Sequence, residues 1–233
     1  MNGCVLPAFG REEVPATKVL PELSGSGGTL GVVLVHDIFG RGPYLKSVAD
    51  ALVAVGVPSA TVDLFGGRVP ASVEEGMQLR EGLTEEFVVE TLEAARVALL
   101  PRLAGPARVG TLGFCMGGGY ALLGACHRPF DFSVDFYGRI ARATDIEGLR
   151  GPVLMILASE DERITSWALS ELLPAANRAK KRVSVELFPG VRHAFHRPGG
   201  ESYDPHAAAV AWHRTLEFLS DVRGTDEPRT GHR

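Results

Sequence analysis

A short stretch near the middle of the chain places the strongest constraint on its fold. Within residues 106–128, an apolar segment (Arg108 to Leu112) and an Ala- and Leu-rich segment (Met116 to Cys126) are joined by Gly113-Phe114-Cys115-Met116-Gly117. The first segment predicts a short buried strand and the second predicts a helix. Glycines two positions on either side of Cys115 suit a tight strand-to-helix turn, because such a turn leaves no room for Cβ atoms. The pattern therefore predicts a cysteine held at a sharp turn, beside a helix N-terminus that favours a thiolate.

Length and charge limit the class of protein. The chain has 233 residues, enough for one large α/β domain or two small ones, and 45% of its residues are hydrophobic. Its formal net charge is −4 and its sequence pI is about 6.0, with Lys and Arg scattered along the chain. These values argue against a nucleic-acid or acidic membrane partner. We find neither a basic segment followed by a long apolar core at the N-terminus nor an apolar run of about 18 residues, so we expect no signal peptide and no membrane span.

The cysteines indicate the cellular compartment. Cys4, Cys115 and Cys126 are odd in number and follow no disulfide pattern. This usage predicts a reducing compartment and a cytoplasmic location. An isolated Gly-x-Cys-x-Gly is a weak signal, and taken alone it favours a buried structural cysteine. The rest of the chain must decide between the two interpretations.

Strands and helices are predicted to alternate along the chain with short connections. The predicted strands are Leu30–Val35, Val57–Val62, Arg108–Leu112, Phe132–Tyr137, Val153–Ala158 and Val183–Phe188. The predicted helices are Tyr44–Val55, Thr84–Leu100, Met116–Cys126, Thr165–Lys180 and Pro205–Leu219, and residues 68–83 are predicted to be irregular or briefly helical. Such alternation is typical of a mostly parallel sheet with helices on both faces. We therefore expect a single α/β domain over residues 28–222, an irregular N-terminal lead-in or edge strand over 1–27, and a polar C-terminal tail over 223–233.

Chemistry in such sheets gathers at the carboxyl ends of the strands. Cys115, Asp161 and His193 follow three of the predicted strands, in the chain order of nucleophile, acid and histidine. Each residue alone has a plainer explanation, such as a turn-forming aspartate or a surface histidine. The three together, in this order and each at a strand end, favour a catalytic triad. Glu160 and Glu162 flank Asp161, so the choice of acid is uncertain by one residue.

Two other kinds of site have weaker support. His193-x-x-His196, with His206 or Asp204 nearby, could start a metal site, but no second ligand pair is evident. The glycine pattern is neither a dinucleotide fingerprint nor a phosphate-binding loop. We therefore expect no metal and no cofactor.

Four stretches make the sequence resemble the dienelactone hydrolase family of α/β-hydrolases. They are Val35-His36-Asp37-Ile38-Phe39-Gly40, Val62-Asp63-Leu64-Phe65, Leu112-Gly113-Phe114-Cys115-Met116-Gly117-Gly118, and Phe188-Pro189-Gly190 with His193-Ala194-Phe195. The resemblance covers roughly residues 28–220. It implies a single α/β-hydrolase domain without a large lid, and an enzyme that cleaves an ester or lactone of the kind hydrolysed by carboxymethylenebutenolidases.

The resemblance also implies a role for each site residue. Cys115 would be the nucleophile, His193 the base and Asp161 the residue that orients it. The backbone N–H groups of Ile38 and Met116 would form the oxyanion hole.

Three further residues would act around this triad. Asp37 would interact with the resting cysteine and help to activate it, although the family has Glu at this position. Arg197 would hold a carboxylate of the substrate, and Arg80 would be a second such residue. The family also has a substrate-contacting Tyr near Arg80, where this chain has Thr84.

Two other classes of protein stay open. A non-catalytic α/β-hydrolase scaffold would keep the fold and serve in binding or regulation. A redox protein would use Cys115 as a reactive thiol, but it needs a resolving cysteine and the chain has no Cys-x-x-Cys. The partner we expect is a small-molecule ester or lactone, bound by a monomer or a small homo-oligomer.

Overall fold

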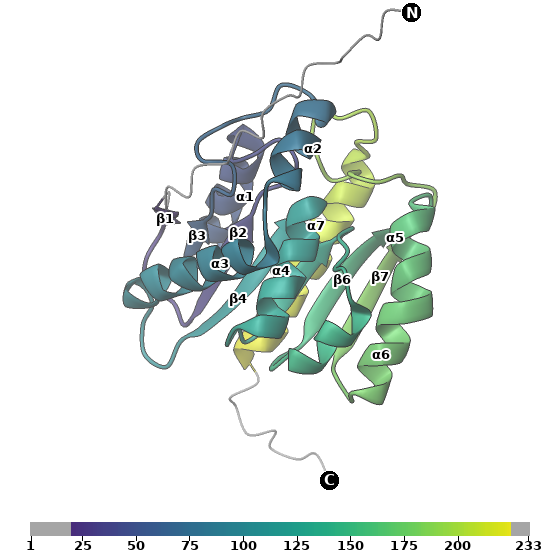
Figure 1. The fold of residues 1–233 in the computed structure, drawn as a ribbon. Coiled ribbons are helices and arrows are strands. Elements are labelled where there is room, and N and C mark those ends of the chain that lie inside the picture. The colour runs from purple at the N-terminus through teal and green to yellow at the C-terminus, as the bar shows by residue number, and fades with distance from the viewer. Residues whose placement is uncertain (1–19, 225–233) are drawn as a thin grey trace, which may run out of the picture.

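One seven-stranded sheet forms the centre of the molecule. The computed structural model describes residues 20–224, so the predictions for residues 1–19, including Cys4, and for 225–233 lie outside it. The strands lie in the order β1-β3-β2-β4-β5-β6-β7 (Figure 1). Their bounds are β1 Glu22–Ser24, β2 Leu30–Val35, β3 Ser59–Thr61, β4 Arg108–Phe114, β5 Ser133–Phe136, β6 Val153–Ala158 and β7 Val183–Phe188. All neighbouring strands are parallel except β1, which pairs antiparallel with β3, and the predicted mostly parallel sheet is confirmed.

Helices cover both faces of the sheet. The helices are α1 Pro43–Ala54, α2 Val73–Glu81, α3 Glu85–Leu99, α4 Met116–His127, α5 Glu162–Trp167, α6 Leu173–Arg178 and α7 Pro205–Gly224. One apolar core lies between the sheet and α1 with α7, and a second lies between the sheet and α3, α4, α5 and α6. Figure 1 shows these two layers in front of and behind the strands. The predicted α/β architecture is therefore confirmed, and α2 lies in the segment predicted to be irregular or briefly helical.

Local sequence signals account for the elements around the site. Every residue of β2 is buried, as its continuous apolar run requires for a central strand. Pro43 begins α1, where its fixed φ suits the first helical position. The Thr84 hydroxyl accepts the Phe87 N–H at 3.1 Å and so caps α3.

The segment 68–83 contains a real helix, α2, of nine residues. The Ser72 hydroxyl accepts the Glu75 N–H at 3.2 Å, and Glu74 and Glu75 lie in the first turn. Both features stabilise a helix N-terminus. Of the two alternatives predicted for residues 68–83, irregular or briefly helical, the structure has the helical one. Its Gly and Glu content goes with few buried side chains, since only Gly76 and Leu79 of α2 are buried.

The predicted helix Thr165–Lys180 is not a regular α-helix. It begins three residues earlier, with α5, and passes through a π-helical stretch, Ala168–Leu172, before α6. Pro174 lies in the first turn of α6 and has no N–H to donate to the preceding turn. The widened turn accommodates this missing hydrogen bond.

The two ends of the domain differ from the predicted boundaries. For the N-terminal segment, the sequence predicted either an irregular lead-in or an edge strand. Within residues 20–27 the structure has the edge strand, β1. At the other end, α7 continues through Arg223 to Gly224. Val222 is 4% exposed and packs in the core beneath α1 and α7, which explains why the helix does not end at Leu219.

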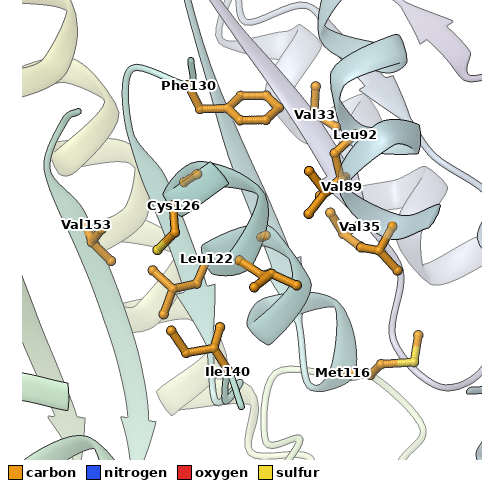
Figure 2. Close-up of a cluster of buried hydrophobic side chains, with 14 of the residues drawn as sticks. Val33, Val35, Val89, Leu92, Met116, Leu122, Cys126, Phe130, Ile140 and Val153 are labelled. Carbon is orange, nitrogen blue, oxygen red and sulfur yellow. The ribbon is translucent and has the colours of Figure 1, made fainter. Parts of the chain in front are cut away.

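The C-terminal half of α4 packs on apolar side chains. Figure 2 shows Cys126 near Leu122 and Val153, far from Met116 at the start of the same helix. None of the helices in residues 20–224 is long and apolar enough to cross a membrane.

Candidate active site

The turn between β4 and α4 holds Cys115 in an unusual backbone conformation. Its φ is 55° and its ψ is −120°, values that non-glycine residues rarely adopt. The Cys115 N–H donates to the Phe136 carbonyl at 2.9 Å, and its own carbonyl accepts N–H groups from Gly118 and Gly119 at 3.0 and 3.2 Å. Such strain persists only where the surroundings enforce it, and it is common at functional sites.

Both glycines of the turn are required by close contacts. A Cβ at Gly113 would lie 2.0 Å from the Gly117 carbonyl oxygen. A Cβ at Gly117 would lie 2.3 Å from the carbonyl oxygen of His36, at the end of β2. The predicted tight turn is therefore present, with the helix start pressed against the neighbouring strand.

Cys115, His193 and Asp161 meet above the carboxyl ends of β4, β6 and β7. His193 Nε2 lies 3.0 Å from Cys115 Sγ, and His193 Nδ1 donates a hydrogen bond to Asp161 Oδ2. The acid side chain is mostly buried, whereas the histidine side chain is 38% exposed and Cys115 is half-buried. The thiol, the imidazole and the carboxylate thus form a continuous hydrogen-bonded line.

The surroundings of His193 favour its protonated form. Burial lowers the pKa of this imidazole, but hydrogen bonds to Asp161 and Cys115 outweigh burial and raise the pKa to about 10. The histidine can therefore take the thiol proton and hold it as an imidazolium beside the sulfur.

The acid of this line is Asp161. Glu160 is exposed, and the Glu162 side chain lies outside what the structure describes. Asp161 also directly precedes α5, and the Thr165 N–H donates to its carbonyl at 3.0 Å. The start of α5 therefore fixes the backbone that carries this carboxylate.

The two backbone N–H groups that the resemblance assigns to an oxyanion hole have no protein acceptor in the described part of the chain. Within residues 20–224, neither the Ile38 N–H nor the Met116 N–H donates a hydrogen bond to a protein acceptor. Met116 is the first residue of α4, where N–H groups have no partner inside the helix. Gly76 of α2 packs on Ile38, since a Cβ there would lie 2.2 Å from the Ile38 carbonyl oxygen.

Asp37 and Arg197 form a half-buried ion pair next to this site. The Asp37 carboxylate accepts the Phe39 N–H at 2.9 Å and an N–H of the Arg197 guanidinium. The thiol, by contrast, bonds to His193, and no hydrogen bond joins Asp37 to Cys115 in the described part of the chain. For Asp37 to act on the cysteine, as the resemblance implies, its carboxylate would first have to leave Arg197.

Arg80 interacts with Tyr120 of α4. It is exposed on α2, and its charge opposes the rise in the pKa of Tyr120 that burial causes. The structure brings Arg80 into contact with none of the three triad residues, and Thr84 serves as the cap of α3.

His36 has a structural role. It is fully buried, its Nδ1–H donates to the Asp37 carbonyl at 2.7 Å, and its Nε2 accepts the Leu64 N–H at 2.9 Å. Burial lowers the pKa of this imidazole, which keeps it neutral and able to accept. His36 therefore ties the loop that carries Ile38 to the loop after β3.

Neither a metal site nor a thiol pair is assembled here. His193 and His196 bond to different partners, and no group of three His, Cys, Asp or Glu among residues 20–224 could hold a metal ion. Cys115 and Cys126 are both free, and eleven residues of helix separate them by about 16 Å at 1.5 Å per residue. This separation is too great for a disulfide.

Sequence reasoning missed Tyr137 and Tyr44 near the site, and it considered His196 only as a possible metal ligand. Tyr137 packs against His193, with 5.0 Å between the ring centroids. Tyr44 and His196 share a hydrogen bond of 2.8 Å although they are 152 residues apart. Tyr137 is the last residue of the predicted strand Phe132–Tyr137 and so had a positional signal. The contact between Tyr44 and His196 depends instead on how α1 and the segment after β7 pack.

Comparisons with known proteins agree with this architecture. A family model described as the dienelactone hydrolase family matches residues 18–223. A Saccharolobus solfataricus protein provisionally named as a carboxymethylenebutenolidase is 34% identical over 151 residues, which are 64% of this chain and 58% of that protein. Carboxymethylenebutenolidase 1 of Cupriavidus pinatubonensis is 28% identical over 205 residues, covering 82% of this chain and 86% of that protein. A solved dienelactone hydrolase-like promiscuous phosphotriesterase from metagenomic libraries matches with a TM-score of 0.74 and 25% identity, covering 84% of this chain and 88% of that one.

Proposed function

Because the chain belongs to the dienelactone hydrolase family, we propose that it hydrolyses a carboxylic ester or lactone with Cys115 as nucleophile. The observation that carries this proposal is the 3.0 Å contact of Cys115 Sγ with His193 Nε2, while Asp161 accepts from the other ring nitrogen. This is the arrangement of an activated nucleophile, a base and the group that orients the base.

The first half of the reaction acylates the cysteine. His193 Nε2 takes the proton of the Cys115 thiol, and the thiolate attacks the carbonyl carbon of the substrate. The negative oxygen that forms accepts hydrogen bonds from the N–H groups of Ile38 and Met116, each worth about 3 kcal/mol in such sites. When the intermediate collapses, the ester C–O bond breaks, and the leaving alkoxide takes the proton from His193.

The second half releases the acid. His193 Nε2 removes a proton from water, and the resulting hydroxide attacks the thioester carbonyl. The C–S bond breaks, the carboxylic acid leaves, and the thiolate recovers its proton from His193. Asp161 keeps a proton on Nδ1 throughout, so that Nε2 always faces the sulfur.

Arg197 is the residue we assign to a substrate carboxylate. Its side chain is 26% exposed, and its guanidinium is paired with Asp37. A carboxylate on the substrate would therefore compete with Asp37 for the same donors, which favours planar bidentate anions. Arg80 is a weaker candidate, because it lies beside Tyr120 instead of beside Arg197.

Hydrolysis of two substrates tests the proposal. We would measure the turnover of an aryl acetate and of a cis-dienelactone by the wild type, by Cys115→Ala, and by Cys126→Ala as the matched control. We expect Cys115→Ala to lose at least about a thousandfold in kcat/KM, as nucleophile removal does in related triads, and Cys126→Ala to keep the activity. Near-normal turnover by Cys115→Ala would refute the proposal, and a folded wild type inert toward both substrates would favour the non-catalytic scaffold.

A further inference from the structure

The Arg197 guanidinium is held from three sides. Asp37 binds its N–H donors, the Phe39 ring lies 4.3 Å from its central carbon, and the Tyr44 ring lies 5.2 Å from the same atom. Both ring distances fall within the range of cation–π attraction. Two aromatic rings and one carboxylate thus decide where this cation points.

The Tyr44 ring is itself fixed by its neighbours. Its hydroxyl lies 2.8 Å from His196 Nδ1, and its ring meets Phe114 edge-on at a centroid distance of 5.2 Å. The hydroxyl also interacts with that of Tyr137. Tyr44 therefore connects the start of α1 with the segment that follows β7.

His196 is suited to accept a hydrogen bond from Tyr44. Its ring is half-buried and stacks on Phe114 at 5.3 Å, and burial lowers its pKa to about 4. Burial also raises the pKa of the Tyr44 phenol, so Tyr44 keeps its proton. At neutral pH the Tyr44 O–H can therefore donate to an uncharged Nδ1, and no ionic group is needed to hold the ring.

We propose that Tyr44 is a positioning residue that holds Arg197 where a substrate carboxylate can reach it, and that His196 fixes Tyr44 for this task. The inference rests on the proposed function, in which Arg197 receives that carboxylate. Tyr44 should therefore raise the preference of the enzyme for substrates that carry a carboxylate, because it acts on them through Arg197. It should have no such effect on neutral substrates.

A pair of matched esters provides the test. Para-nitrophenyl butyrate and mono-para-nitrophenyl succinate share a leaving group, but only the second has a carboxylate on its acyl chain. We expect Tyr44→Leu to lower the preference for the succinate ester about tenfold, through its KM, because the ring and its hydroxyl are both lost. We expect Tyr44→Phe and His196→Leu to lower it about threefold, because the ring over Arg197 remains but is no longer fixed.

A double-mutant cycle separates positioning from general damage. In an Arg197→Met background, Tyr44→Leu should change the preference no further, because the cation that Tyr44 holds is gone. Tyr203→Leu is the matched control, since Tyr203 is 38% exposed on the surface, and it should leave both esters unaffected. An equal loss for both esters in Tyr44→Leu, or the same change of preference with and without Arg197, would overturn the inference.

A binding measurement keeps this inference distinct from the proposed function. If the wild type hydrolyses neither ester through Cys115, the proposed function fails, and succinate binding then tests the Arg197 site alone. Trp212, whose ring lies 6.2 Å from His196, provides a fluorescence signal. Weaker succinate binding by Tyr44→Leu supports the inference, whereas unchanged binding, or no binding by the wild type, overturns it.

Discussion

Cys115 and Cys126 differ sharply although both belong to the same strand–turn–helix segment. Cys115 is half-buried at the start of α4, beside His193. Cys126 is buried near the helix end, where burial, aided by the charge of Asp145, raises the pKa of its thiol to about 12. We therefore expect a reactive thiol at Cys115, before the start of α4, and an inert one at Cys126, near its end.

Alkylation should detect this difference. In a Cys4→Ser variant near neutral pH, we expect iodoacetamide to modify Cys115 at least about a hundredfold faster than Cys126, because the thiolate is the reacting form. Peptide mass spectrometry over a time course would measure both rates. Equal rates would mean that Cys115 is a structural cysteine and would favour the non-catalytic scaffold.

The glycines of the turn allow a second test at the scale of single residues. A Cβ at Gly117 would collide with backbone oxygens of His36 and Val35 at 2.3 and 2.5 Å, and a backbone cannot move aside as a side chain can. We expect Gly117→Ala to lower the free energy of unfolding by roughly 3 kcal/mol and to abolish activity.

Gly224→Ala is the control for this substitution. Gly224 ends α7, and nothing lies within 4 Å of a Cβ added there. Urea unfolding and ester hydrolysis would be measured for both variants. A Gly117→Ala protein as stable and as active as Gly224→Ala would show that the turn is looser than the structure indicates.

At the scale of elements, β5 carries a buried acid that the proposed mechanism does not use. Asp135 is 0% exposed, and its Oδ1 accepts the Gly138 N–H at 2.7 Å. Burial raises the pKa of this carboxyl to about 7, against the opposing effects of Gly138 and His193. The folded protein therefore binds this proton more tightly than the unfolded chain does.

The sign of the resulting pH dependence follows from linkage. Protonated Asp135 adds to the free energy of unfolding at low pH. This contribution, on the order of 4 kcal/mol, is lost as pH rises from about 4 to about 7. Asp135→Asn cannot titrate, so the stability of the wild type relative to this variant should fall over that range and then stay level. Urea unfolding at several pH values would measure the free energy of unfolding of both proteins, with a variant of the exposed Asp50, Asp50→Asn, as the control. A difference independent of pH would contradict the raised pKa.

Element types followed from the sequence more reliably than element ends. β2, β6 and β7 match the predicted strands residue for residue. β2 and β6 are continuous apolar runs, and β7 is rich in β-branched and apolar residues between Arg182 and Pro189. The π-helical stretch before Pro174 and the extension of α7 to Gly224 were missed. Both depend on packing against the sheet, which periodicity along one segment does not encode.

At the scale of the whole molecule, the sheet assembles a site from distant parts of the sequence. Chain order and strand ends were enough to nominate Cys115, Asp161 and His193, because parallel strands bring their carboxyl ends to one edge. The same reasoning could not pair Asp37 with Arg197 or Tyr44 with His196, since those contacts join loops whose course depends on the packed helices. The oligomeric state and the cytoplasmic location stay predictions.

The most direct test of the central claim is to look for the acyl-enzyme itself. After brief mixing with para-nitrophenyl acetate and an acid quench, intact-mass and peptide analysis should find one acetyl group on Cys115, and none in Cys115→Ala. If His193→Gln is still acetylated, a larger fraction of it than of the wild type should carry the acetyl group, because the base that activates water is absent. Rapid hydrolysis by Cys115→Ala would contradict the claim that Cys115 is the nucleophile. An acetylated intermediate on another residue would contradict it as well.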